Sequence, residues 1–243
     1  TRETVAIVAG KIPVLMNIAE QTTKAAIALA KSAKEDGASG LMMLPPMRYK
    51  ASDAEIVHYF KSVANSTSLP IMIYNNPVDY KLVVTLDMFQ ELLDACPNIQ
   101  AVKESTRDTT NITRIKNRFG NRLAIMTGVD TLALESLVLG ADGWVAGLVD
   151  AFPAETVAIY KLVKAGRIQE AITIYRWFMP LLELDIHPKL VQYIKIASVH
   201  TGIGNEYVRA PRLVLEGAER VRIEKVITDA LAIRPTLPDY KNL

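Results

Sequence analysis

Short apolar runs recur along the first two thirds of the chain, and each is followed by a longer segment with helical periodicity. At intervals of 19 to 30 residues, the runs begin near Pro13, Gly40, Pro70, Gln100, Leu123 and Asp142. Such runs between turn-forming residues are typical of strands buried in a parallel sheet, and parallel strands need crossovers that are usually helical. The pattern predicts six parallel strands that alternate with helices.

Signals for helix starts support this assignment. Hydroxyl residues precede the predicted helices 24–35 and 86–96, as is typical of N-caps. Ser52 and Glu55 have the spacing of a capping box, in which each side chain accepts a hydrogen bond from a free backbone N–H. Pro153 is predicted to open another helix, because proline suits the first helical turn.

The alternation of strands and helices stops after Ala165. Three helical segments and an extended tail follow, and the segments span residues 167–183, 188–200 and 217–232. We therefore expect a barrel domain over residues 1–165 and a C-terminal helical extension over residues 166–243.

Six parallel strands fit either a doubly wound sheet or part of a (β/α)8 barrel. A dinucleotide-binding sheet is expected to carry G-x-G-x-x-G after its first strand, and this motif is absent from the sequence. The predicted strands instead end in chemically diverse residues, as in barrel enzymes, whose sites are assembled from several strand ends. We favour an α/β fold of the (β/α)8 TIM-barrel type, and we expect its first two strands to precede Thr1.

Composition narrows the choice of partners and location. The 28 basic and 26 acidic residues give a net charge of +2, so neither nucleic acid nor an anionic membrane is an expected partner. The single cysteine, Cys96, excludes an internal disulfide and favours a cytoplasmic location. The most apolar region, residues 132–152, contains three acidic residues and does not predict a membrane span. The three histidines lack the spacing of metal ligands, so we expect no metal site.

Two candidate catalytic residues end neighbouring predicted strands. Lys103 ends the run from Ile99, and a partly desolvated amine at such a strand end can attack a carbonyl carbon. Tyr74 ends the preceding run, and its phenol could relay protons to the same small molecule, because adjacent strands lie about 5 Å apart. Taken singly, each residue is more often structural: a lysine that extends into solvent, or a core aromatic whose hydroxyl is satisfied.

The order of four motifs favours a catalytic role over a structural one for these two residues. They are Tyr74-Asn75-x-Pro77, Val102-Lys103-Glu104-Ser105, Thr127-Gly128-x-Asp130 and Gly140-Ala141-Asp142-Gly143. In this order they resemble the dihydrodipicolinate synthase / N-acetylneuraminate lyase family of class I aldolases, over essentially the whole chain. The resemblance implies a (β/α)8 barrel with a helical C-terminal extension, usually a homotetramer, that works without a cofactor.

The resemblance also implies roles for individual residues. Lys103 is implied to form a Schiff base with the ketone of a 2-oxo acid, often pyruvate, and Tyr74 to shuttle protons above the imine. At the position of Val145, the family has a backbone carbonyl near the lysine. Substrate contacts are implied for Arg48, Asn76, Thr127, Gly128 and Val145.

The chain departs from the family pattern in three places. The Gly-Thr-Thr-Gly-Glu-like loop that binds the carboxylate of the 2-oxo acid is not among these residues, so we expect these residues alone to be inactive or unfolded. Asp79 stands where true synthases have an arginine for the carboxylate of the second substrate. In an ungapped alignment Arg48 stands where synthases have a tyrosine that reaches the neighbouring subunit's site, and a shift by one residue brings Tyr49 there instead. The Arg48 guanidinium either clamps a substrate carboxylate or is a solvated loop charge.

The leading hypothesis is therefore a Schiff-base-forming lyase that acts on a 2-oxo acid or a cyclic imino acid by aldol cleavage, dehydration or deamination. The first alternative is a true 4-hydroxy-tetrahydrodipicolinate synthase, which the acid at position 79 disfavours. A second alternative is a non-catalytic family remnant that only binds small molecules. A third alternative is a doubly wound small-molecule binder.

Overall fold

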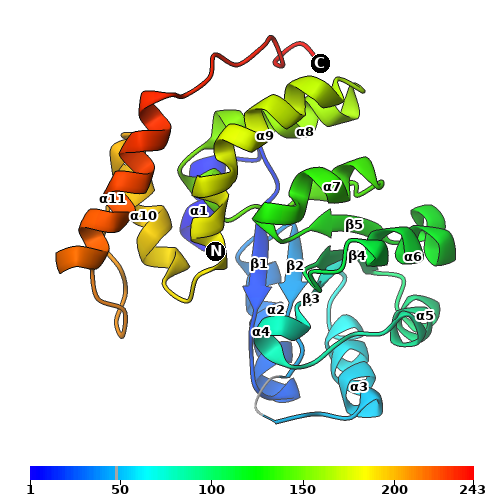
Figure 1. The fold of residues 1–243 in the computed structure, drawn as a ribbon. Helices are drawn as coiled ribbons and strands as arrows, with labels where there is room; N and C mark the ends of the chain where they lie inside the picture. Colours follow the sequence, from blue (N-terminus) through cyan, green and yellow to red (C-terminus); the bar gives the residue numbers. More distant parts are fainter. Residues whose placement is uncertain (47–48) are drawn as a thin grey trace. The chain divides into compact units, whose positions relative to one another are not determined.

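The computed structural model describes residues 1–46 and 49–243, which form two compact units, residues 1–126 and residues 127–243 (Figure 1). In the first unit the strands are β1 (Leu15–Ile18), β2 (Gly40–Met43), β3 (Ile71–Asn75) and β4 (Ile99–Glu104). The helices of the first unit are α1 (Arg2–Val8), α2 (Thr23–Glu35), α3 (Asp53–Ala64), α4 (Pro77–Tyr80), α5 (Leu86–Ala95) and α6 (Thr110–Phe119). Strand β5 (Ala124–Thr127) contains the boundary between the units.

Strands β1 to β4 pair in parallel and in chain order. The register places Tyr74 of β3 beside Lys103 of β4, and Asn75 beside Glu104. Because side chains alternate across a strand, Tyr74 and Lys103 share one face of the sheet, and the other pair lies on the opposite face. The pairing therefore brings the two candidate catalytic residues together at the carboxyl ends of their strands.

Helices α2, α3 and α5 cover the sheet of the first unit in succession (Figure 1). Helix α2 contacts β1 and β2, helix α3 packs between α2 and α5, and helix α5 contacts β4. Phe60 on α3 and Phe89 on α5 are fully buried in this layer. Burial of each side chain contributes about 1.5–3 kcal/mol to the stability of the fold. The helix layer therefore stabilises the sheet that carries the two candidate catalytic residues.

The second unit is mainly helical. It contains β6 (Gly143–Trp144), α7 (Ala133–Val138), α8 (Pro153–Lys164), α9 (Ile168–Leu182), α10 (Leu190–His200) and α11 (Gly217–Ala232). Helix α9 packs against both α8 and α11, and α10 packs against α11. Phe152 and Phe178 are fully buried, with their ring centroids 5.4 Å apart in an edge-to-face contact.

The strand and helix positions predicted from the sequence are confirmed. Each predicted apolar run contains one observed strand, and α8 begins at Pro153 as expected. The side chain of Thr22 caps α2, and the capping box of Ser52 and Glu55 opens α3. Among the described residues, no helix is long and apolar enough to cross a membrane. The domain division between residues 165 and 166 stays a prediction.

Candidate functional site

Tyr74 and Lys103 form a direct contact at the ends of β3 and β4. Both side chains are half-buried, and the Lys103 Nζ atom lies 4.1 Å from the centroid of the Tyr74 ring. A cation over an aromatic face is attracted by the negative charge of the π system. The amine therefore lies against the tyrosine ring at the strand ends.

Tyr74 is in turn held by residues of the short helix α4. Tyr80 packs against its ring edge-to-face, with the centroids 5.5 Å apart. Burial, together with the nearby Tyr74 and Asp79, raises the pKa of Tyr80 to about 12, so its phenol is protonated at neutral pH. The Tyr74 hydroxyl accepts a hydrogen bond of 3.2 Å from Asn76 Nδ2.

Asn76 lies between Tyr74 and Asp79. Its side chain is buried, and its Nδ2 also donates a 2.7 Å hydrogen bond to Asp79 Oδ2. Its Oδ1 accepts a 3.3 Å hydrogen bond from the backbone N–H of Asp79, which makes Asn76 the N-cap of α4. The predicted substrate contact at Asn76 thus has its amide engaged within the protein.

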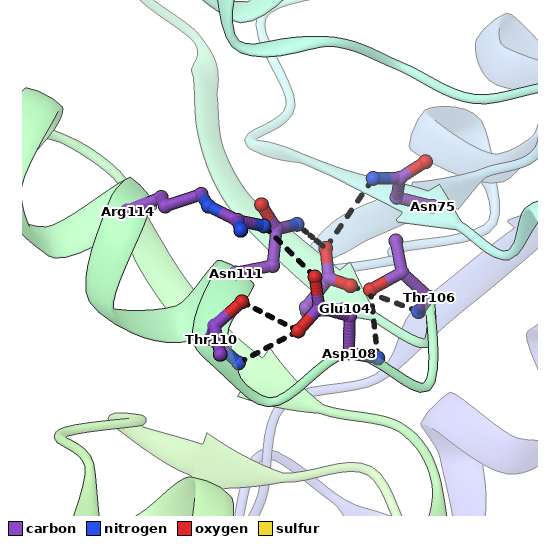
Figure 2. A network of polar contacts seen from close by, with 7 residues as sticks. All are labelled: Asn75, Glu104, Thr106, Asp108, Thr110, Asn111 and Arg114. Carbon is purple, nitrogen blue, oxygen red and sulfur yellow. Dashed lines mark hydrogen bonds and ion pairs between the residues drawn. The ribbon is translucent and has the colours of Figure 1, made fainter.

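The opposite face of the same strand pair carries a buried carboxylate, Glu104, which is 4% exposed. Figure 2 shows three hydrogen bonds that converge on it. Thr106 N donates at 2.8 Å, Asn111 Nδ2 at 3.0 Å and Asn75 Nδ2 at 3.3 Å. Burial raises the pKa of Glu104, while the hydrogen bonds from Thr106, Asn75 and Asn111 oppose that rise.

This network reaches the loop that follows β4 (Figure 2). Asp108 accepts hydrogen bonds from Thr110 N at 3.0 Å and from Thr110 Oγ1 at 2.5 Å, and it pairs with Arg114 at 2.8 Å. The hydrogen bonds from Thr110 and Arg114 lower the pKa of Asp108, so it stays charged. The loop from Glu104 to α6 is therefore fixed by side chains at both ends.

The second unit contains the predicted contacts Thr127, Gly128 and Val145. Thr127 is buried at the end of β5, and its carbonyl oxygen accepts a 2.9 Å hydrogen bond from Val145 N. Gly128 and Val145 are half-buried. The structure thus links Thr127 to Val145 through the backbone.

Asp130 organises the loop beside these residues. Its carboxylate is fully buried and accepts hydrogen bonds from Trp144 Nε1 at 2.9 Å, Gly147 N at 3.2 Å and Leu148 N at 2.8 Å. Its backbone carbonyl oxygen accepts a 2.8 Å hydrogen bond from the Tyr175 hydroxyl. The aspartate of the Thr-Gly-x-Asp motif is therefore a structural anchor for residues 144–148.

Two further predictions concern Arg48 and metal ions. Arg48 lies outside the described residues. Within residues 1–46 and 49–243, no group of three or more histidine, cysteine or acidic side chains could hold a metal ion.

Sequence reasoning did not assign roles to Glu104 or Asp130, although both stand inside the quoted motifs. The signal was present in each case. Lys103 and Glu104 are adjacent on one strand, and successive side chains point to opposite faces, so one of the two had to face the covered side of the sheet. Asp130 follows a buried strand and precedes loop backbone with free N–H groups.

The chain is similar to proteins of one family. The model of the Dihydrodipicolinate synthetase family matches residues 1–230. The 4-hydroxy-tetrahydrodipicolinate synthase of Chlorobium phaeovibrioides is 29% identical over 202 residues, which cover 83% of this chain and 68% of that protein. The synthase of Staphylococcus carnosus is 27% identical and covers 89% of this chain and 73% of that protein.

The chain is also similar in structure to solved proteins of this kind. The 4-hydroxy-tetrahydrodipicolinate synthase of Methylacidiphilum fumariolicum has a TM-score of 0.87 at 25% identity, covering 96% of this chain and 78% of that one. Dihydrodipicolinate synthase of Aquifex aeolicus has a TM-score of 0.87 at 26% identity, covering 98% and 80%. These likenesses confirm the predicted barrel-type α/β fold, represented here by six βα units, and exclude the doubly wound alternative.

Proposed function

Because the chain belongs to the dihydrodipicolinate synthetase family, we propose that it is a lyase that forms a Schiff base through Lys103. The substrate is a 2-oxo acid or a cyclic imino acid. The observation that carries the proposal is the contact between the Lys103 amine and the Tyr74 ring, 4.1 Å apart on paired strands. A nucleophile and a proton carrier at the ends of adjacent strands supply the attacking amine and the proton transfer that imine formation needs.

The proposed steps use these two side chains in turn. The neutral Lys103 amine attacks C2 of the 2-oxo acid, and one amine proton moves to the former ketone oxygen. Tyr74 gives its phenolic proton to that hydroxyl, which leaves as water, so an iminium ion and a phenolate remain. The phenolate then takes a proton from C3, and the C–H electron pair forms the C2–C3 double bond of a neutral enamine.

Asp79 favours some substrates over others. Its side chain is exposed and lies one hydrogen bond from Asn76, close to Tyr74. A carboxylate there repels a second substrate carboxylate and accepts hydrogen bonds from hydroxyl or ammonium groups. We therefore favour dehydration, deamination or aldol cleavage of a hydroxylated substrate over condensation with an anionic aldehyde.

The second candidate is a true 4-hydroxy-tetrahydrodipicolinate synthase, since similar relatives bear that name at 27–29% identity. A substrate screen on the full-length protein separates the two. A synthase consumes pyruvate together with an aldehyde that carries a carboxylate, whereas the favoured lyase releases pyruvate or 2-oxoglutarate semialdehyde. The roles of Thr127, Gly128 and Val145 as substrate contacts remain proposals.

Borohydride trapping tests the central step. We expect reduction of the full-length protein in the presence of pyruvate to add the mass of the reduced adduct to the peptide that contains Lys103. The Lys103→Arg variant should give no adduct, because a guanidinium does not form the imine. Lys61→Arg is the matched control, since Lys61 forms an ion pair with Glu91 that arginine can keep. An unmodified Lys103 peptide with every 2-oxo acid tried would refute the proposal.

A further inference from the structure

The geometry around Asn76 fixes which end of its amide faces Tyr74. An asparagine side chain has one end that only accepts hydrogen bonds and one that only donates them. The Asp79 carboxylate only accepts, and it lies 2.7 Å from Nδ2, while the Asp79 backbone N–H only donates, and it lies 3.3 Å from Oδ1. Both contacts fail if the amide turns over, so Asp79 sets its direction.

The direction of the amide decides whether the Tyr74 hydroxyl donates or accepts in its hydrogen bond with Asn76. With Nδ2 turned toward it, Asn76 donates to the Tyr74 oxygen at 3.2 Å. The phenolic hydrogen must then point elsewhere, because the oxygen is the acceptor in this contact. Lys103 Nζ packs on the ring of the same tyrosine, so a group bound at the lysine lies near this hydroxyl and can receive its hydrogen.

We propose that Asn76 and Asp79 are positioning residues for proton transfer by Tyr74, an inference that rests on the proposed Schiff-base function. A donor aimed at a phenol oxygen stabilises the negative charge that develops there when the proton leaves. Asp79 acts through Asn76 and keeps the donor in place. Asn76 therefore works on the tyrosine and is not itself a contact for the substrate.

The different burial of Asn76 and Asp79 is consistent with these roles. Asn76 is 5% exposed, so a lost hydrogen bond there is not replaced freely by water. Asp79 is exposed, so its charge carries little desolvation cost while it orients the buried amide. The sequence places Tyr74, Asn76 and Asp79 within six residues, because α4 begins directly after β3.

The test separates imine formation from proton transfer. With pyruvate as probe, borohydride trapping reports the imine, and exchange of the pyruvate methyl hydrogens with deuterated water, followed by NMR, reports proton removal at C3. The variant Asp79→Asn keeps the shape of the side chain but replaces the carboxylate, which only accepts, by an amide that can also donate. Only the longer backbone contact of 3.3 Å then opposes a turned Asn76 amide. Asn76→Ala removes the donor altogether, and Asp53→Asn removes an exposed charge from α3 as the matched control.

We expect Asp79→Asn and Asn76→Ala to slow exchange roughly tenfold, the effect of one charge-assisted hydrogen bond. The amount of imine trapped at equilibrium should stay within about twofold of the unaltered protein, and Asp53→Asn should change neither that amount nor the exchange rate. The pH profile of exchange should move to higher pH in both variants. Among the described residues, the titratable groups that face Tyr74 are Lys103 on β4 and Asp79 and Tyr80 on α4. Their ionisation also contributes to the pH profile.

Each remaining outcome counts against the inference. Unchanged exchange in both variants would show that Asn76 does not assist Tyr74. Equal loss of trapping and exchange with an unmoved pH profile would indicate a merely structural role. Absence of trapping in the unaltered protein would remove the proposed function, and this inference with it, whereas retained trapping with unchanged exchange would remove the inference alone.

Discussion

The Lys103 amine lies over the face of the Tyr74 ring, and this contact can stabilise more than one positively charged form of the lysine nitrogen. The ring face attracts the ammonium ion, and in the proposed mechanism it also attracts the positive charge of the iminium at the same nitrogen. In the same proposal, the hydroxyl of this tyrosine supplies the proton for the departure of water. One residue therefore contributes separately through its ring and through its oxygen.

Two substitutions of Tyr74 should separate these contributions. Tyr74→Phe keeps the ring but loses the proton donor for the departure of water, so the imine should form more slowly. The amount trapped with pyruvate at equilibrium should persist, while methyl exchange falls roughly 100-fold, the lower range for a lost acid–base group. Tyr74→Leu removes the ring as well, and the loss of about 1 kcal/mol of cation–π attraction should weaken trapping roughly fivefold further. Mass spectrometry and NMR measure the two effects. Equal trapping by both variants would show that the ring contact is incidental.

The pairing of Tyr74 with Lys103 could be predicted from the sequence because neighbouring parallel strands have a fixed spacing. The bonds of Asn76 could not, since they depend on how the four-residue helix α4 turns after the strand. A helix this short has too few residues to show periodicity. Asp79 was therefore interpreted from the sequence only as a charge facing the substrate, whereas it also orients Asn76.

At the scale of elements, Glu104 ties the end of β4 to β3 and α6. All three of its partners donate N–H groups, and the partners lie on the strand Ile71–Asn75, in the loop after β4 and on the helix Thr110–Phe119. Burial nevertheless raises the pKa of the carboxyl in the folded protein. A raised folded pKa means that the folded state binds the proton more tightly than the unfolded state.

Glu104 should therefore make the free energy of unfolding depend on pH. Its contribution is fully present below the unfolded pKa, near 4.3, and is lost as pH rises through the higher folded pKa. Glu104→Gln cannot titrate, so the difference in free energy of unfolding between the two proteins should change with pH above about 4.3 and level off at higher pH. Urea denaturation at a series of pH values from 4 to 8 measures it. A constant difference over that range would contradict the assignment.

The capping box of α3 gives a second prediction at this scale. Ser52 N donates to Glu55 Oε2 at 2.8 Å, and Glu55 N donates to Ser52 Oγ at 3.4 Å. Ser52→Ala should lower the free energy of unfolding by about 1 kcal/mol, as expected for a lost N-cap. Ser68→Ala is a suitable control because Ser68 lies outside the helices, and denaturant midpoints compare the two. A midpoint for Ser52→Ala equal to that of the control would show that the box does not stabilise α3.

Helices such as α3 were predictable because caps and apolar periodicity are local signals. Strands β1 to β6 were predictable for the same reason, since each is a short apolar run between turns. The short 3-10 turns at 120–122, 130–132 and 148–150 were not, because their conformation depends on partners distant in sequence. The turn at 148–150, for example, begins where Leu148 N donates to Asp130.

At the scale of the molecule, the change from alternating units to consecutive helices after Ala165 was visible in the sequence as a change of period. The two compact units follow a different division, which falls within β5. Compactness depends on which side chains pack together, and a single sequence does not show this for residues far apart along the chain. The order of elements was thus predictable from the sequence, and the domain division between residues 165 and 166 stays a prediction.

The second unit has its own spectroscopic probe, which allows its stability to be tested separately. Both tryptophans of the chain lie in it: Trp144 donates to Asp130 Oδ1 at 2.9 Å, and Trp177 donates to the carbonyl oxygen of Ala230 at 2.8 Å. The carboxylate of Asp130 accepts hydrogen bonds from Trp144, Gly147 and Leu148. In Asp130→Asn, only one oxygen remains to accept these hydrogen bonds, and an NH₂ group, which cannot accept, replaces the other. Leaving a buried donor without an acceptor costs about 1–3 kcal/mol, so we expect a loss of about 2 kcal/mol in the free energy of unfolding.

Tryptophan fluorescence during urea denaturation measures this loss, and the native emission of Trp144 should shift as its hydrogen bond is weakened. Asp229→Asn is the matched control, since Asp229 is an exposed partner of Lys225 and such pairs contribute at most about 1 kcal/mol. If Asp130→Asn and Asp229→Asn have the same midpoint, the buried carboxylate does not anchor residues 144–148. If the midpoint falls only for Asp130→Asn, the aspartate of the Thr-Gly-x-Asp motif stabilises this loop, because its oxygens accept hydrogen bonds from backbone and indole N–H groups.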